Sequence, residues 1–101
     1  MESQLENWTI YEHFISVRMN ITILTPDKDI FEGPIKSVKV PGIGGQFEIL
    51  SNHAPIVSAL GEGNIRLIKE DNEKMSFQIN KGFVEVLNNE VSLLVEGVTF
   101  P

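Results

Sequence analysis

The sequence contains no cysteine and only two histidines, and it has no long hydrophobic run. The missing cysteines exclude a disulfide framework and a zinc-finger spacing, and they favour a reducing compartment. No apolar stretch approaches the roughly 18 residues that a membrane-spanning helix needs. The N-terminus also lacks the basic and then apolar pattern of a secretory signal peptide. The sequence therefore predicts a soluble, cytoplasmic protein.

Basic and aromatic residues are scarce as well. Eight Lys and Arg stand against 14 Asp and Glu, which gives a net charge of −6, and aromatic residues make up 8% of the chain. A nucleic-acid partner would require a basic stripe and stacking aromatics, so none is expected. A chain of 101 residues forms one domain with one modest core and little room for a deep enclosed pocket. This size argues against a self-sufficient enzyme.

The two histidines, His13 and His53, lie in dissimilar surroundings. Catalysis would require an orienting carboxylate and a nucleophile within hydrogen-bond reach. A small metal-dependent barrel enzyme would need at least two histidines with a carboxylate, and only His53 with Glu48 is available. Ala54 precedes Pro55 and is biased towards extended geometry, which places His53 on a rigid bend. A structural or interface role for His53 is favoured, with no catalytic, metal or cofactor site.

The first part of the chain differs from the rest. Residues 1–18 form a leader that fits an amphipathic helix or an alternating strand equally well. From Met19 the hydrophobic period becomes two, which is typical of strands with one buried face. Turn residues punctuate the chain at 25–29, 61–63, 70–73, 81–82 and 88–90, and Glu32-Gly33-Pro34 predicts a further break. Short strands at this spacing, with no convincing helix, predict an antiparallel sandwich or barrel.

A segment from Pro41 to Gly63 is unusual for its glycines, and Gly42, Gly44 and Gly45 lie close together in it. Glycine accepts positive φ readily, so the backbone can turn sharply here and approach another surface closely. Phosphate binding is disfavoured, because a phosphate loop should open a helix and supply a lysine. This loop instead leads into an alternating segment, Phe47 to Leu50. A turn or bulge that meets a partner is the preferred interpretation.

Strict alternation leaves an excess of apolar residues. Both faces of the segment Phe83–Leu87 carry large apolar groups, and Leu24, Ile68 and Leu94 occupy positions that should be polar. Two explanations are favoured equally by the sequence. The first is that both faces are covered within the domain, and the second is that an apolar patch is reserved for a partner.

Spaced motifs occur in a fixed order along the chain: Phe31-x-Gly33, Val38-x-Val40-Pro41, Gly42-x-x-Gly45, Ile49-Leu50-x-x-His53-Ala54-Pro55, Leu60-x-x-Gly63 and Gly82-Phe83-Val84-Glu85-Val86-x-Asn88. Through this ordered set the chain resembles the epsilon subunit of F-type rotary ATP synthases over about residues 19 to 97. The resemblance implies a single antiparallel β-sandwich of about ten short strands over residues 19–97, with a tail at 98–101. It also implies a non-catalytic central-stalk subunit that clamps the gamma subunit to the membrane c-ring and couples proton translocation to ATP synthesis.

The same resemblance assigns two surfaces. Gly42, Gly44, Gly45 and Gln46 are expected to face the c-ring. The residues expected to face gamma are Thr25, His53, Ser58 and Phe83. The implied location is peripheral, on the cytoplasmic side of the cell membrane as part of the complex. The alternative function is a freestanding β-sandwich that binds a small ligand between its sheets.

Several positions depart from the family pattern. Glu48 and Ser51 stand where the family commonly has glycine and proline, and Lys81 replaces a usual glycine. Many members continue after the sandwich into a two-helix hairpin that inhibits ATP hydrolysis and in some binds ATP, whereas Pro101 ends this chain. The expectation is a short form that does not inhibit through that hairpin and has no ATP site of that kind.

Overall fold

The computed structural model describes residues 18–101, and within them every regular element is a strand. The all-β class predicted from the two-residue period is therefore confirmed. The leader predicted over residues 1–18 lies outside the described residues except for Arg18. The eight strands are β1 (Met19–Leu24), β2 (Asp29–Gly42), β3 (Gly45–Leu50), β4 (Ile56–Leu60), β5 (Gly63–Lys69), β6 (Lys74–Ile79), β7 (Lys81–Leu87) and β8 (Glu90–Glu96).

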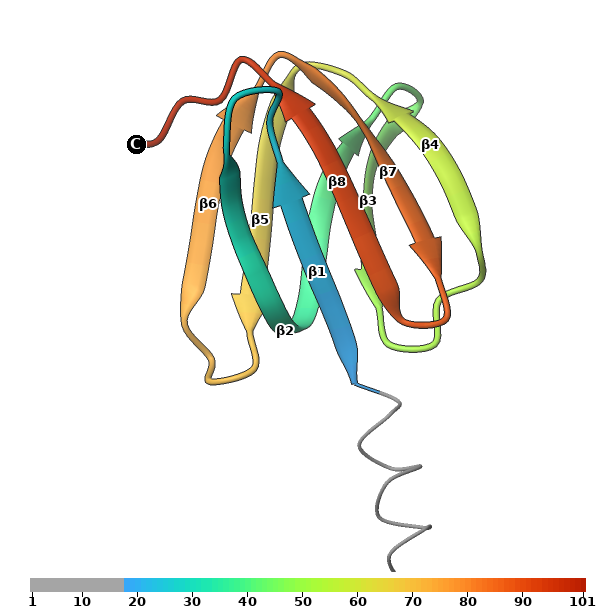
Figure 1. The fold of residues 1–101 in the computed structure, drawn as a ribbon. Helices are drawn as coiled ribbons and strands as arrows, with labels where there is room; N and C mark the ends of the chain where they lie inside the picture. The colour runs from blue at the N-terminus through green and yellow to red at the C-terminus, as the bar shows by residue number, and fades with distance from the viewer. Residues whose placement is uncertain (1–17) are drawn as a thin grey trace, which may run out of the picture.

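The strands form two facing layers (Figure 1). One layer contains β1, β8, β7 and β4 in that order, and the other contains β3, the second half of β2, β5 and β6. Neighbours are antiparallel except β1 and β8, which run parallel. The fold is a sandwich, in which each layer buries one face against the other.

Strand β2 joins the two layers. Its first half pairs with β1 and its second half pairs with β3 and β5, so this 14-residue strand belongs to both. The break predicted at Glu32-Gly33-Pro34 is wrong, because these residues lie inside β2. A register shift between Ile35 and Ser37 bends the strand. This bulge lets Ile35 and Val38 both face the core although they are three residues apart. One long, bent strand thus replaces two of the short strands that were expected. The described residues form eight strands, whereas about ten were predicted.

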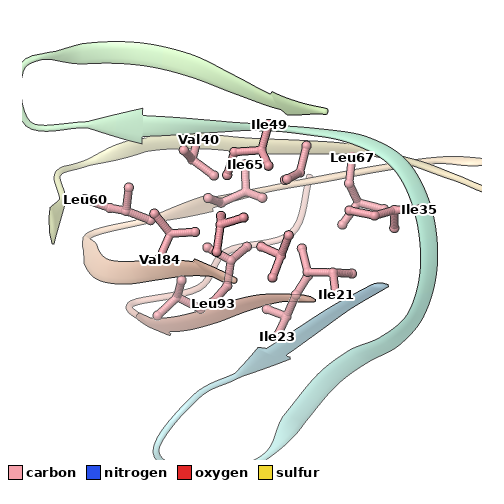
Figure 2. Packing of buried hydrophobic residues seen from close by; sticks show 14 of the residues in the cluster. Ile21, Ile23, Ile35, Val40, Ile49, Leu60, Ile65, Leu67, Val84 and Leu93 are labelled. Atoms are coloured by element: carbon pink, nitrogen blue, oxygen red, sulfur yellow. The ribbon is translucent and has the colours of Figure 1, made fainter. Parts of the chain in front are cut away.

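The core between the layers consists of aliphatic side chains with one buried aromatic ring, that of Phe77. Figure 2 shows isoleucines, leucines and valines from both layers packed together there. The buried residues follow the predicted alternation closely in β8, where Val91, Leu93 and Val95 face inward. Core side chains from both layers occupy the space between the sheets (Figure 2).

Residues 98–100 pack along the free edge of β6. The backbone groups of Thr99 and Gln78 exchange two hydrogen bonds of 2.9 Å. The rings of Phe100 and Phe77 lie 5.6 Å apart between centroids, and Val98 packs against the core. The segment predicted as a tail therefore covers an edge that would otherwise expose unpaired backbone groups.

At Gly82 there is no room for a side chain between β7 and β8. A Cβ atom built there would stand 2.5 Å from the carbonyl oxygen of Leu94 and 3.0 Å from a methyl group of Val95. At Gly44 a Cβ atom would meet open space. We expect Gly82→Ala to lower the free energy of unfolding by about 2 kcal/mol or more and Tm by on the order of 10 °C. The reason is that the backbone carbonyl of Leu94 cannot move aside as the end of a flexible side chain can. Gly44→Ala is the matched control, and thermal unfolding followed by circular dichroism measures both. Equal Tm values for the two variants would contradict this packing.

Candidate docking surface

An apolar row crosses the outer face of the layer formed by β1, β8, β7 and β4. Ala59 lies opposite Phe83, Phe83 lies opposite Leu94, and Leu94 lies opposite Leu24. Their chain neighbours Val84 and Leu93 are buried, so the row faces outward. Phe83 is 58% exposed and Leu94 is 53% exposed. Cross-strand pairing thus gathers apolar residues from four strands into one row.

The row forms one wall of an open groove of about 690 Å³. Ile43 also lines this groove and is 74% exposed, although it comes from the tip of the β2–β3 turn. The polar residues that line the groove are Thr25, Lys81 and Glu96, and the last two form an ion pair of 3.3 Å. Val57 is 73% exposed on β4, two residues before Ala59 and on the same face. The apolar surface therefore extends beyond the groove itself.

The outer face of the other layer has a different character. There a row across β3, β2, β5 and β6 consists of polar and charged side chains: Glu48, Lys39, Arg66 and Ser76. All four are exposed. The next row is mixed, with half-exposed Leu50 and Ile68 on either side of the small Ser37, which is 8% exposed. Among residues 18–101, the extended apolar surface thus lies on the outer face of β1, β8, β7 and β4, and this is the face that favours a partner.

The predicted glycine turn is a tight hairpin at the end of β2. Gly42 pairs with Gly45, and Ile43 and Gly44 form the two-residue turn between them. Gly45 has φ of 136°, a conformation that favours glycine. Gly44, Gly45 and Gln46 are exposed. The four residues expected to face the c-ring are therefore brought together, with Ile43 between them.

Of the four residues expected to face gamma, two lie on the apolar groove, namely Thr25 and Phe83. The Thr25 hydroxyl holds the β1–β2 turn by accepting bonds from the backbone N–H groups of Asp27 (3.2 Å) and Lys28 (3.0 Å). Ser58 is half-buried opposite Val84, on the inward side of β4. The structure therefore does not place Ser58 on the apolar outer face.

His53 lies away from the glycine hairpin. The hairpin adjoins the Leu60 end of β4, where Gly42 pairs, whereas the segment at 51–55 enters β4 at Ile56. Figure 1 shows the β2–β3 turn at the upper end and the β3–β4 connection at the lower end. His53 is half-buried, and its Nδ1 lies 2.7 Å from the carbonyl oxygen of Ala54. It is part of a shaped segment, and no acid–base partner within the described chain is hydrogen-bonded to its ring.

No three His, Asp or Glu side chains among residues 18–101 gather where they could hold a metal ion. In the same range, no helix is long and apolar enough to cross a membrane.

Sequence reasoning missed three members of the apolar surface: Ile43, Val57 and Ala59. Val57 lies in β4, and Ile43 lies at the tip of the glycine hairpin. One signal was available for Ile43, because a large aliphatic residue at the tip of a tight turn has no core to enter. Val57 carried no such signal, since β4 could have been covered on either side.

Comparisons with known proteins agree on one family. The family model described as the β-sandwich domain of the ATP synthase delta/epsilon chain matches residues 18–101. The ATP synthase epsilon chain of Chlorobium limicola is 44% identical over 79 residues, which are 78% of this chain and 90% of the relative. The epsilon chain of Thermosynechococcus vestitus is 42% identical over 79 residues, but they make up only 56% of that relative.

Solved structures share the fold. A chain in the mitochondrial ATP synthase of Euglena gracilis, in an OSCP/F1/c-ring structure, superposes with a TM-score of 0.77 at 20% identity, covering 83% of this chain and 54% of that one. A chain in the central stalk/c-ring structure of the Tetrahymena thermophila mitochondrial ATP synthase gives 0.69 at 19% identity, covering 82% and 66%. At this level of identity the similarity concerns the fold.

Fold and surface together define a class, that of small β-sandwich domains with one apolar outer face. The family match is more specific. This chain belongs to the family of ATP synthase delta/epsilon chains, of the epsilon type, and it is a non-catalytic component of the synthase.

Proposed function

We propose that this chain is the rotor subunit that clamps gamma to the c-ring of an F-type ATP synthase. The apolar outer face of β1, β8, β7 and β4 binds gamma, and the glycine hairpin faces the polar loops of the c-ring. The single observation that carries the proposal is the apolar row Leu24, Leu94, Phe83 and Ala59, in which, within residues 18–101, Phe83 and Leu94 are exposed and Leu24 and Ala59 are half-buried. The solved neighbours come from ATP synthase structures that contain a c-ring, and one of them is described as a central stalk with its c-ring.

The energetic argument for this face is the cost of leaving it in water. Burying apolar surface is worth about 25 cal/mol per Å², and a stable interface buries about 800 Å² on each partner. A central aromatic surrounded by aliphatic residues is the usual arrangement of an interface hot spot, and Phe83 has that position between Ala59 and Leu94. The corresponding row on the other outer face contains charged side chains. Burying that face against a partner would remove the water that hydrates those charges.

The two docking surfaces adjoin at Ile43. This residue belongs to the glycine hairpin and also lines the apolar groove with Phe83 and Leu94. A partner on the groove and a partner on the hairpin would therefore meet at one end of the sandwich. Such an arrangement suits a clamp, because both contacts lie on one close-packed body that transmits strain instead of absorbing it.

The support for a contact with gamma differs among the four residues that are expected to face it. Thr25 and Phe83 are supported by their place on the groove. His53 belongs to a segment at the opposite end of β4 and would contact a second part of gamma. Ser58 would be reached only at the open side of β4, because its side chain faces inward. The subunit would lie peripherally on the cytoplasmic side of the cell membrane, held there by the complex.

Reconstitution with gamma tests the proposal directly. We expect the chain and the gamma subunit from the same source to elute together as a one-to-one complex in size-exclusion chromatography at micromolar concentration. Separate elution would contradict the proposed clamp. A rise in Tm on adding small apolar ligands, together with separate elution, would instead support the ligand-binding alternative.

The glycine hairpin gives a functional prediction. Gly44→Glu combined with Gln46→Glu should reduce proton-driven ATP synthesis several-fold more than ATP hydrolysis, because a disturbed c-ring contact uncouples rotation from the catalytic sites on other subunits. Gly44 suits this change since its Cβ meets open space, whereas Gly45 has φ of 136° and would be strained. Both rates are measured in membrane vesicles.

The matched control for the hairpin variant is Ser76→Glu, which adds an acid on the charged outer face opposite Arg66. It should leave both rates unchanged. An equal loss of synthesis and hydrolysis in the hairpin variant, or no loss, would remove the c-ring assignment.

A further inference from the structure

The β7–β8 hairpin turns through two asparagines that both adopt positive φ. Leu87 pairs with Glu90, and Asn88 and Asn89 between them have φ of 51° and 63°. These are the conformations of a two-residue hairpin turn of the primed type, for which asparagine and glycine are the preferred residues. The turn itself therefore needs positive φ at both positions, but it does not need a side-chain amide at either one.

Asn89 nevertheless uses its side chain to hold a distant segment. The backbone N–H of Asn52 donates to Oδ1 of Asn89 at 2.6 Å, and Nδ2 of Asn89 donates to Oδ1 of Asn52 at 3.3 Å. The backbone carbonyl of Asn89 also accepts a bond of 2.9 Å from the N–H of Asn20. One half-buried residue thus ties the hairpin, the start of β1 and the β3–β4 connection together.

The held segment has few other restraints. Asn52 itself has φ of 67°, a conformation that costs free energy for a residue other than glycine. The N–H of His53 donates to the carbonyl oxygen of Leu50 at 3.1 Å, and Ala54 and Pro55 are exposed. Within residues 18–101, no strand pairs with residues 51–55. The two bonds from Asn89 therefore hold the entrance to the His53 segment.

We propose that Asn89 is a positioning residue that presets the His53-Ala54-Pro55 segment for docking. This inference rests on the proposed function, in which His53 contacts gamma. A segment already held in its bound conformation loses less entropy on association, so Asn89 strengthens binding without touching the partner through its amide. Figure 1 shows the β3–β4 connection and the β7–β8 turn near each other at the same end of the sandwich.

The chain offers a matched pair of variants for the test. Asn89→Gly keeps a residue that accepts positive φ and removes the amide, whereas Asn88→Gly makes the same change one position earlier and leaves both bonds to Asn52 intact. Asn89→Asp restores the acceptor for the Asn52 N–H and serves as the conservative rescue. Thermal unfolding of all three variants establishes that each one folds.

Two readouts decide the proposal. Loss of a hydrogen bond worth about 1 kcal/mol should speed hydrogen exchange of the Asn52 amide roughly 5-fold or more in Asn89→Gly, and should weaken gamma binding by about 3- to 10-fold. Asn88→Gly should change neither quantity, and Asn89→Asp should recover most of the protection. Exchange is followed by NMR on the free chain, and affinity by calorimetry with purified gamma.

Unchanged exchange in Asn89→Gly would overturn the proposal, because the bonds would then not hold the segment. Faster exchange with unchanged affinity for gamma would overturn the positioning role and leave the proposed function standing. Failure of the unmodified chain to bind gamma would overturn the proposed function, and the positioning role with it, whatever the exchange rates show. The failure of the inference and the failure of the function are therefore distinguishable.

Discussion

Phe83→Glu is expected to abolish stable binding of the gamma subunit while the sandwich remains folded. Phe83 lies at the centre of the apolar row and is 58% exposed, so the isolated domain hydrates a glutamate there without rearrangement. In a complex the same carboxylate would be buried between Ala59 and Leu94 with no cation beside it in this chain's row. Removing a central aromatic anchor typically costs 2 kcal/mol or more, which is about 30-fold in Kd, and the buried charge adds to that.

Calorimetry with purified gamma measures this effect. The control is again Ser76→Glu, which introduces the same charge on an exposed strand residue of the opposite outer face. We expect the control to bind gamma with the affinity of the unmodified chain. If Phe83→Glu bound equally well, or if Ser76→Glu lost binding in its place, gamma would dock on the other layer and the proposed face would be wrong.

Leu93 and Leu94 should differ sharply in their effect on stability although they are adjacent. Leu93 is fully buried in the core and Leu94 is 53% exposed on the apolar row. Leu93→Ala should cost about 2–5 kcal/mol, because it removes buried methyl groups and leaves a cavity. A domain of this size has on the order of 5–15 kcal/mol of stability in total, so the variant will be close to unfolding at moderate temperature.

Leu94→Ala should change the free energy of unfolding by less than about 1 kcal/mol, because its side chain is already half in water. It should instead weaken gamma binding directly. Leu93→Ala should reduce gamma binding only because a smaller fraction of the chain is folded. Urea unfolding measures the first quantity and calorimetry the second. Comparable destabilisation by both variants would show that the row at Leu94 is covered within the chain and is not free for a partner.

Local regularities of the sequence were enough to locate most strands. The buried positions in β6, β7 and β8 follow the expected two-residue period, and Asn88-Asn89 forms the tight turn that its residue types favour. The prediction failed at Glu32-Gly33-Pro34, where turn residues lie inside β2. Pairing with β1 on one side and a bend between the layers accommodate them, and neither is visible in a local window.

The apolar surface was only half predictable. The excess of large apolar residues around Phe83 and Leu94 was evident, but alternation cannot tell a face covered within the domain from a face left for a partner. Ser58 was assigned to gamma with Phe83, yet β4 turns Ser58 inward and Phe83 lies opposite Ala59. The pairing register decides this point, because a shift of one residue moves every side chain of a strand to the other face.

The sequence by itself determined the family, the all-β class, the positions of most strands and the glycine turn, since each depends on residues near one another along the chain. Only the tertiary structure decided which outer face is apolar, that Ile43 joins that face to the glycine hairpin, and that Asn89 holds Asn52 across 37 residues. The physical reason is that sheet order and register are set by pairing between distant strands. A two-residue period records which side chains share a face, but it carries no information about what lies opposite that face.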